Sequence, residues 1–145
     1  MSYAIQDSIK LSATPEHVFA VATDWENQHR WVFATRARAD KNNGQGVGGS
    51  IWAFTGLLGI GFIDTMTITA WQPPFVCNIV HTGKVVRGSG SFKVAAGMSG
   101  STFTWSEELE LPFGILNSLA WIFVKPISRW ALHLTLKRFQ KIVQK

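Results

Sequence analysis

The sequence predicts an α+β fold in which a curved antiparallel β-sheet wraps around one long C-terminal helix. Residues 115–145 contain a single helix breaker, Pro126, and their apolar residues recur every three or four positions, as in an amphipathic helix. The preceding eighty or so residues lack this spacing and alternate between turn signals, as strands do. Because the turns between these strands are short, the strands are predicted to pair antiparallel.

The first elements are a strand over residues 3–12 and two short helices. Thr14 is a favourable N-cap, and Pro15 after it suits the first position of a helix. Asp24 begins a second short helix that ends near Trp31. The predicted order of elements is therefore β-α-α-β6-α.

Six strands are predicted between the short helices and the last helix. Pro73 and Pro74 end the third of them, because proline lacks the donor that a strand ladder needs. The apolar stretch 56–61 joins the second and third strands, and it is either a mobile lid over a cavity or a packed hairpin turn. The six strands span residues 33–39, 47–56, 62–71, 76–82, 85–95 and 102–111.

Length and composition indicate one core-rich domain over residues 1–145. Hydrophobic residues make up 46% of the chain, with seven Trp and ten Phe, which excludes a disordered chain. The single cysteine, Cys77, has no partner for an intrachain disulfide and fits a reducing cytosol. With no signal-like start, a cytoplasmic protein is expected. The longest apolar run, 119–124, is far shorter than the roughly 20 residues of a membrane span.

The positive charge is concentrated in the last helix. The chain carries a formal net charge of +5, which suggests either a solvated helix face or contact with an anionic partner or membrane surface. The strands lack the basic, aromatic patches of single-strand binders, so no nucleic-acid partner is expected. The cations of this helix are Lys125, Arg129, Lys137, Arg138, Lys141 and Lys145.

The helix needs a partner for its apolar stripe, and the sheet is the predicted partner. At steps of three and four, the residues expected to face the sheet are Leu116, Leu119, Ala120, Phe123, Ile127, Trp130, Ala131 and Leu134.

Two carboxylates are predicted on the inner face of the sheet. Strand alternation places Asp64 on the side of Met66, and Glu107 on the side of Trp105 and Leu109. A charged acid among apolar side chains is costly unless it is protonated, paired or at a rim. Each acid is therefore either a polar anchor or general acid–base in a cavity, or a rim carboxylate paired with Arg or Lys.

His81 is the third candidate for chemistry. It shares the parity of Cys77 and Ile79 and so points inward if they do. Its imidazole is either a base or donor toward a ligand, or a core histidine with its hydrogen bonds satisfied. No His or Cys pair has metal-ligand spacing, and the glycine-rich stretches 44–49 and 56–61 fit no phosphate loop. No metal or other cofactor is therefore predicted.

The element order and several corner motifs together resemble the START/Bet v 1-like (SRPBCC) superfamily and, within it, the polyketide cyclase/dehydrase-like proteins. The likeness spans essentially the whole chain and implies a helix-grip fold with a deep, mostly apolar cavity between sheet and helix. Members include cyclases, hydrolases, lipid carriers, hormone receptors and co-chaperone-like modules, so fold alone does not give function. The motifs are residues 8–19 (Ser-Ile-Lys-Leu-Ser-Ala-Thr-Pro-Glu-His-Val-Phe), Asp24-Trp25, Gly46-Val47-Gly48-Gly49, Trp71-Gln72-Pro73-Pro74 and Trp105-Ser106-Glu107-Glu108-Leu109.

With this resemblance, inward-facing residues become candidate ligand contacts, and the first half of the last helix becomes the expected cavity floor. The candidates for catalysis are Glu107, Asp64 and His81. The candidates for ligand binding are Trp31, Phe33, Ile51, Asp64, Met66, Ile68, His81, Phe92, Trp105, Glu107, Leu116, Ala120 and Phe123.

Three functions follow as hypotheses. The first is binding of a small hydrophobic or amphipathic molecule, such as a lipid, polyketide or isoprenoid-like compound. The second is a cyclase/dehydratase-type enzyme in which a cavity acid or His transfers protons. The third is an interaction or co-chaperone-like module, with Trp52 and Phe54 exposed on the outer face as a partner or homodimer patch. Whether the protein is an enzyme stays open.

Overall fold

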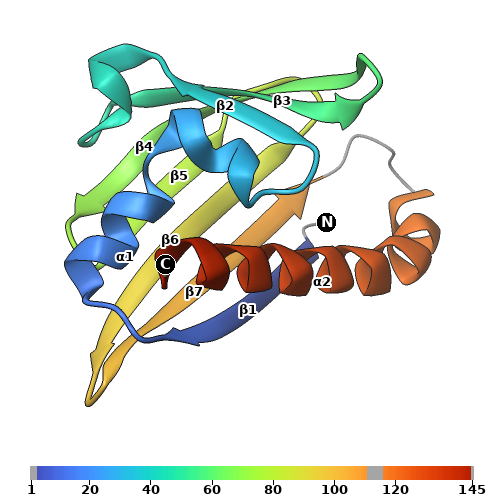
Figure 1. Cartoon of the computed structure of the whole chain (residues 1–145). Helices are drawn as coiled ribbons and strands as arrows, with labels where there is room; N and C mark the ends of the chain where they lie inside the picture. Colours follow the sequence, from blue (N-terminus) through green and yellow to red (C-terminus); the bar gives the residue numbers. More distant parts are fainter. Residues whose placement is uncertain (1–2, 111–115, 145) are drawn as a thin grey trace.

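The chain folds as one curled sheet of seven antiparallel strands that grips a long C-terminal helix (Figure 1). The computed structural model describes residues 3–110 and 116–144 and, in the last helix, the side chains of Ile122 and of residues 125–144. The strand order is β1-β7-β6-β5-β4-β3-β2. The predicted helix-grip fold and element order are confirmed.

The elements follow one another with short connections. The strands are β1 (Tyr3–Leu11), β2 (Thr35–Ala39), β3 (Ser50–Leu57), β4 (Ile60–Gln72), β5 (Val76–His81), β6 (Arg87–Gly97) and β7 (Gly100–Glu110). The helices are α1 (Pro15–Ala22), the short 3-10 helices η1 (Trp25–Arg30) and η2 (Lys41–Gly44), and α2 (Leu116–Val143).

The start of α1 follows the predicted capping chemistry. The Thr14 hydroxyl oxygen accepts a hydrogen bond from the backbone N–H of His17 at 3.3 Å, and Pro15 occupies the first turn. The second short helix, η1, is a 3-10 helix. Together α1 and η1 form the V-shaped element that covers one end of the sheet (Figure 1).

Two strand boundaries differ from the prediction, one because of glycines and one because of a tight turn. β3 begins at Ser50 rather than at 47, because Gly46 and Gly48 adopt φ values of 73° and 89°, which suit a turn. Within the stretch 56–61, residues 56–57 end β3 and residues 60–61 begin β4, so the turn between them has only two residues, Leu58 and Gly59. Of the two alternatives for this stretch, the hairpin turn is present, but it is not packed, because Leu58 is fully exposed. The mobile lid stays a prediction.

Aromatic rings fill the core between the sheet and α2. Trp31, Phe103 and Phe139 are each no more than 1% exposed. The ring centroid of Phe139 lies 4.6 Å from that of Trp31 and 4.6 Å from that of Phe103. Burial of such rings stabilises a fold by several kcal/mol, at roughly 25 cal/mol per Å² of apolar surface.

The predicted stripe of α2 is wrong in the described part of the helix. Ile127 and Trp130 are 65% and 64% exposed. The residues that face the core are instead Leu132, Leu136, Phe139 and Val143. Both sets recur at steps of three and four, so periodicity alone cannot choose between them; the packing of α2 against β1 does.

Two further surface features bear on the predictions. The described cations of α2 (Lys125, Arg129, Lys137, Arg138 and Lys141) are all exposed, as both interpretations of them require.

Ile51 and Ala53 are buried, which turns Trp52 to the outer face, where the Arg38 guanidinium lies 4.7 Å from its ring centroid. The homodimer stays a prediction. In the described part of the chain, the helices are too short or too polar to cross a membrane.

Candidate ligand-binding pocket

A cavity of about 220 Å³ opens on the concave face of the sheet, between the strands and η1. Alternate residues of β3, β4 and β5 point into it, because successive side chains of a strand face opposite sides. Its apolar lining is Trp25, Val32, Ala53, Met66, Cys77, Ile79, Phe92 and Trp105. The remaining lining residues are Gln28, Thr35, Thr55, Asp64, His81, Gly90, Ser91 and Glu107.

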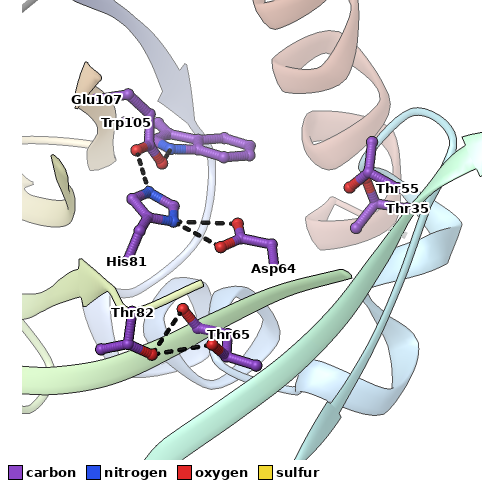
Figure 2. A network of polar contacts seen from close by, with 8 residues as sticks. All are labelled: Thr35, Thr55, Asp64, Thr65, His81, Thr82, Trp105 and Glu107. Atoms are coloured by element: carbon purple, nitrogen blue, oxygen red, sulfur yellow. Dashed lines mark hydrogen bonds and ion pairs between the residues drawn. The ribbon is translucent and has the colours of Figure 1, made fainter. Parts of the chain in front are cut away.

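An imidazole held between two carboxylates forms the polar wall of this pocket (Figure 2). His81 Nδ1 lies 3.0 Å from both carboxylate oxygens of Asp64, and His81 Nε2 lies 2.9 Å from Glu107 Oε2. The indole Nε1–H of Trp105 donates to Glu107 Oε1 at 2.8 Å. We call Asp64, His81 and Glu107 the acid–imidazole cluster.

Three strands bring the cluster together although its members are far apart in sequence. Asp64 lies on β4 and His81 on the adjacent β5, where it pairs with Met66, two residues after Asp64. Glu107 lies on β7, separated from β5 by β6. The side chains of His81 and Glu107 must therefore meet across β6.

Gly90 of β6 makes that meeting possible. It pairs with Glu107 in the sheet, and a Cβ added to it would lie 2.7 Å from Glu107 Oε1. The Glu107 carboxylate therefore occupies the space above β6 that any larger residue would take. Sequence reasoning assigned Gly90 no part in the site, so this role was missed.

Two carboxylates determine the protonation of His81. Burial alone lowers the pKa of His81, but the hydrogen bonds and charges of Asp64 and Glu107 outweigh it and raise this pKa to about 9. The imidazole is therefore protonated at neutral pH and donates from both nitrogens. Cys77 lies on the same strand and also lines the pocket; burial raises the pKa of its thiol to about 12, so that side chain is neutral.

Six of the predicted ligand-contact residues line the pocket: Asp64, Met66, His81, Phe92, Trp105 and Glu107. In the part of the chain that the structure describes, Asp64 and Glu107 both pair with His81, and neither pairs with an Arg or Lys at a rim. His81 has both ring nitrogens satisfied and also faces the cavity. The pairing of the three candidates was not apparent from the sequence.

The other predicted contacts lie elsewhere. Trp31, Ile51 and Ile68 are 1% exposed and belong to the packed core instead of the cavity wall. Phe33 is 58% exposed; it precedes β2, so strand alternation does not govern its direction. The predicted floor residues Leu116, Ala120 and Phe123 have side chains outside the described part of the structure.

Several lining residues were absent from the prediction. Ala53 and Thr55 share the parity of Ile51, and Ile79 shares that of His81, so extending the alternation along each strand would have found them. Trp25 and Gln28 come from η1, where no periodic signal marks the side that meets the cavity. Within the described residues, no group of His, Cys, Asp and Glu side chains is arranged to hold a metal ion.

Solved structures of similar fold come from diverse proteins. TTHA0849 from Thermus thermophilus has a TM-score of 0.78 at 14% identity, with 97% of each chain covered. The Zhui aromatase/cyclase from Streptomyces sp. R1128 also has a TM-score of 0.78, at 10% identity, over 99% of this chain and 94% of that one. Ara h 8.0201 has a TM-score of 0.69 at 15% identity, covering 99% and 98%. At these identities the likeness shows the fold alone.

Sequence comparison adds the family. Curated proteins give no significant match to the chain. One family model, described as polyketide cyclase / dehydrase and lipid transport, matches residues 3–144, which is nearly all of the sequence. The protein therefore belongs to the polyketide cyclase / dehydrase and lipid transport family.

Proposed function

We propose that the protein binds a small, mainly apolar molecule in the pocket, with the polar end of that molecule against the acid–imidazole cluster. The observation that carries the proposal is a charged cluster on one wall of an otherwise largely apolar cavity. The cavity volume of about 220 Å³ is about what seven water molecules occupy in the liquid. It suits one or two rings better than an extended lipid chain.

Naphthol is a suitable probe of this pocket, and its size sets the affinity to expect. Naphthol has two fused rings and one hydroxyl group, and its apolar body would be buried against Phe92, Trp105 and Ile79. At roughly 0.3–0.5 kcal/mol for each of its eleven non-hydrogen atoms, its Kd is expected to be about 0.1–4 mM.

Calorimetric titration of naphthol tests this function. Ala53→Leu adds three carbons at a buried, cavity-lining position of β3, so it should weaken binding at least tenfold. Ala95→Leu is the matched control, since Ala95 is exposed on β6 and away from the pocket lining. Equal affinity of naphthol for wild type and Ala53→Leu would place the binding outside this cavity and refute the proposal.

A second function, proton transfer on the bound molecule, is favoured by one specific observation. In the cluster a protonated imidazole links two carboxylates at 2.9 and 3.0 Å. A carboxylate of this cluster that faces the cavity can take a proton from a bound C–H or O–H group. That carboxylate then becomes neutral, and the positive charge of the imidazolium offsets the negative charge left on the bound molecule. This is the chemistry of an enolisation, the kind of step that a cyclase or dehydratase needs.

Deuterium exchange separates binding from catalysis. Hydroxyacetophenone carries a polar hydroxyl group and slowly exchanging methyl hydrogens, so mass spectrometry in D₂O can follow its exchange. Wild type should accelerate the exchange over buffer, and Glu107→Gln and Asp64→Asn should reduce the acceleration at least tenfold. If the probe binds but its methyl hydrogens exchange at the buffer rate, the protein binds such ketones without catalysing proton transfer, and the second function is excluded for them.

A further inference from the structure

We infer that the polar end of the molecule bound in this pocket is a hydrogen-bond donor, an ammonium, hydroxyl or phenol group, and not a carboxylate, a phosphate or a carbonyl group without such a donor beside it. The inference rests on the proposed function, because it concerns the ligand of the same pocket. It depends on which hydrogen-bond donors and acceptors of the pocket side chains are not already used within the protein.

The N–H groups of the cluster are all used within it. A protonated His81 has two N–H donors; one is directed at Asp64 at 3.0 Å and the other at Glu107 at 2.9 Å. The nearby indole N–H of Trp105 donates to Glu107 at 2.8 Å. A ligand acceptor placed here would have to displace one of these charge-assisted or buried bonds.

The hydroxyl groups of the pocket are also engaged as donors. Thr35 Oγ1 donates to the carbonyl oxygen of Phe33 at 3.1 Å, so the 3.1 Å contact between the Thr35 and Thr55 hydroxyls uses the proton of Thr55. Ser91 Oγ donates to Asn78 Oδ1 at 2.6 Å. All three bonds join protein groups to one another, so none of these hydroxyl protons is left for the ligand.

Few donors remain at the end of the cavity formed by η1. The Trp25 indole N–H donates to the carbonyl oxygen of Gly44 at 2.8 Å, and one amide hydrogen of Gln28 reaches the carbonyl oxygen of Ala22. The second amide hydrogen of Gln28 and the thiol of Cys77 are what is left among the pocket side chains, and a thiol is a weak donor.

Acceptors, in contrast, are in surplus. A carboxylate offers about four lone-pair sites. Among the described residues, Asp64 accepts only from His81, and Glu107 accepts one bond on each oxygen, from His81 and Trp105. Their side chains are 13% and 15% exposed, so a bound molecule would shield much of that remaining exposure. Lone pairs that lose water on binding must then be satisfied by the ligand, which requires a donor.

The charge of the pocket favours the same ligand class. Two carboxylates and one imidazolium sum to one negative charge, and among the described residues no lysine or arginine lines the cavity. An anionic head would therefore lie beside two carboxylates without a compensating cation. A cationic head would be attracted to the carboxylates, and the lining also holds the aromatic rings of Trp25, Phe92 and Trp105, a residue type that binds cations.

Four probes with one naphthalene body test the inference by calorimetry at pH 7. Naphthol and naphthylmethylamine carry donors, naphthyl methyl ether carries only an acceptor, and naphthoate is an anion. Both donor probes should bind at least tenfold more tightly than the ether, and naphthoate should bind most weakly. If the ether or naphthoate binds as tightly as naphthol, the donor inference is overturned while the binding function stands. If none of the four binds, the proposed function itself fails.

Variants then show whether the cluster is the source of the preference. Glu107→Gln and Asp64→Asn each replace one carboxylate oxygen by an amide nitrogen that donates hydrogen bonds, so naphthol should bind less tightly relative to the ether, and its preference should fall to within about threefold. Glu110→Gln makes the same change at an exposed position of β7 and should keep the full preference. A full tenfold preference in both folded cluster variants, with folding checked by thermal unfolding, would overturn the assignment to these carboxylates.

Discussion

The two ends of the concave face are built from the same strands and yet differ in what fills them. At the closed end, Trp31, Phe103 and Phe139 pack ring against ring, with Phe139 supplied by α2. At the open end, beside Asp64, His81 and Glu107, a cavity remains, and the described side chains of α2 do not line it. Strand alternation thus supplies inward side chains everywhere, and the packing of the helix decides where they become core and where they stay accessible.

This difference separates stability from function along one sheet. The closed end is built mainly from aromatic rings, so it gains from every ring that is buried. The open end retains two carboxylates whose burial is tolerated only because one imidazolium lies between them. Substitutions at the two ends should therefore have different consequences.

The largest effect is expected at the closed end. Phe139→Ala removes a ring that is 0% exposed and contacts two other rings, and such a change costs about 3–5 kcal/mol of unfolding free energy. Urea denaturation measures it. Phe75→Ala is a suitable control, because Phe75 is 46% exposed and should lose far less. A loss below about 1 kcal/mol for Phe139→Ala would mean that α2 does not close the core as described.

The next effect is a pH dependence that belongs to the open end. The folded-state pKa of His81, about 9, lies above its ordinary value of 6.5. The cluster therefore contributes stability that is fully present below about pH 6.5 and is lost as pH rises through about 9. The full loss is on the order of 3 kcal/mol.

Unfolding free energies of wild type and His81→Gln between pH 6 and pH 10 test this expectation. The difference between the two proteins should shrink as pH rises, because the glutamine cannot lose a proton and effects of other titrating groups largely cancel. A difference that stays constant over this range would show that His81 is not held protonated by the two carboxylates.

A smaller effect is expected from Gly90→Ala, which alters the open end without touching the core. The new Cβ would meet the end of the Glu107 side chain, which can move aside, so stability should change by less than about 1 kcal/mol. The displaced carboxylate should nevertheless weaken naphthol binding several-fold in calorimetry. Gly97→Ala on the same strand, where the nearest atom is 3.6 Å away, is the matched control. Unchanged affinity in Gly90→Ala would argue against Glu107 as a ligand contact.

The fold was largely predictable from the sequence, because it depends on local signals. Thr14 and Pro15 mark the start of α1, and strand alternation assigned the inward faces of Asp64, His81 and Glu107 before any contact was known. The face of α2 was not predictable in the same way. Ile127 and Trp130 are as regularly spaced as Leu132 and Leu136, and only the contact with the sheet distinguishes the two stripes.

The cluster itself lay beyond sequence reasoning for a geometric reason. Asp64, His81 and Glu107 are seventeen and twenty-six residues apart, and their meeting depends on strand register and on the missing side chain of Gly90. The spacing of the three residues in the sequence predicts neither the strand register nor the room that Gly90 leaves for the Glu107 carboxylate. Phe33 was predicted to point inward as the first residue of a strand. β2 begins two residues later, so strand alternation does not set the direction of this side chain.

Indole NMR signals give the most direct test of where the ligand lies. Trp105 donates its N–H to Glu107 at the pocket wall, whereas the Trp52 ring lies on the outer face under Arg38. Titration with naphthol should shift the indole N–H resonance of Trp105 with the Kd found by calorimetry and leave that of Trp52 unchanged. A saturating shift at Trp52 with none at Trp105 would contradict binding at the acid–imidazole cluster.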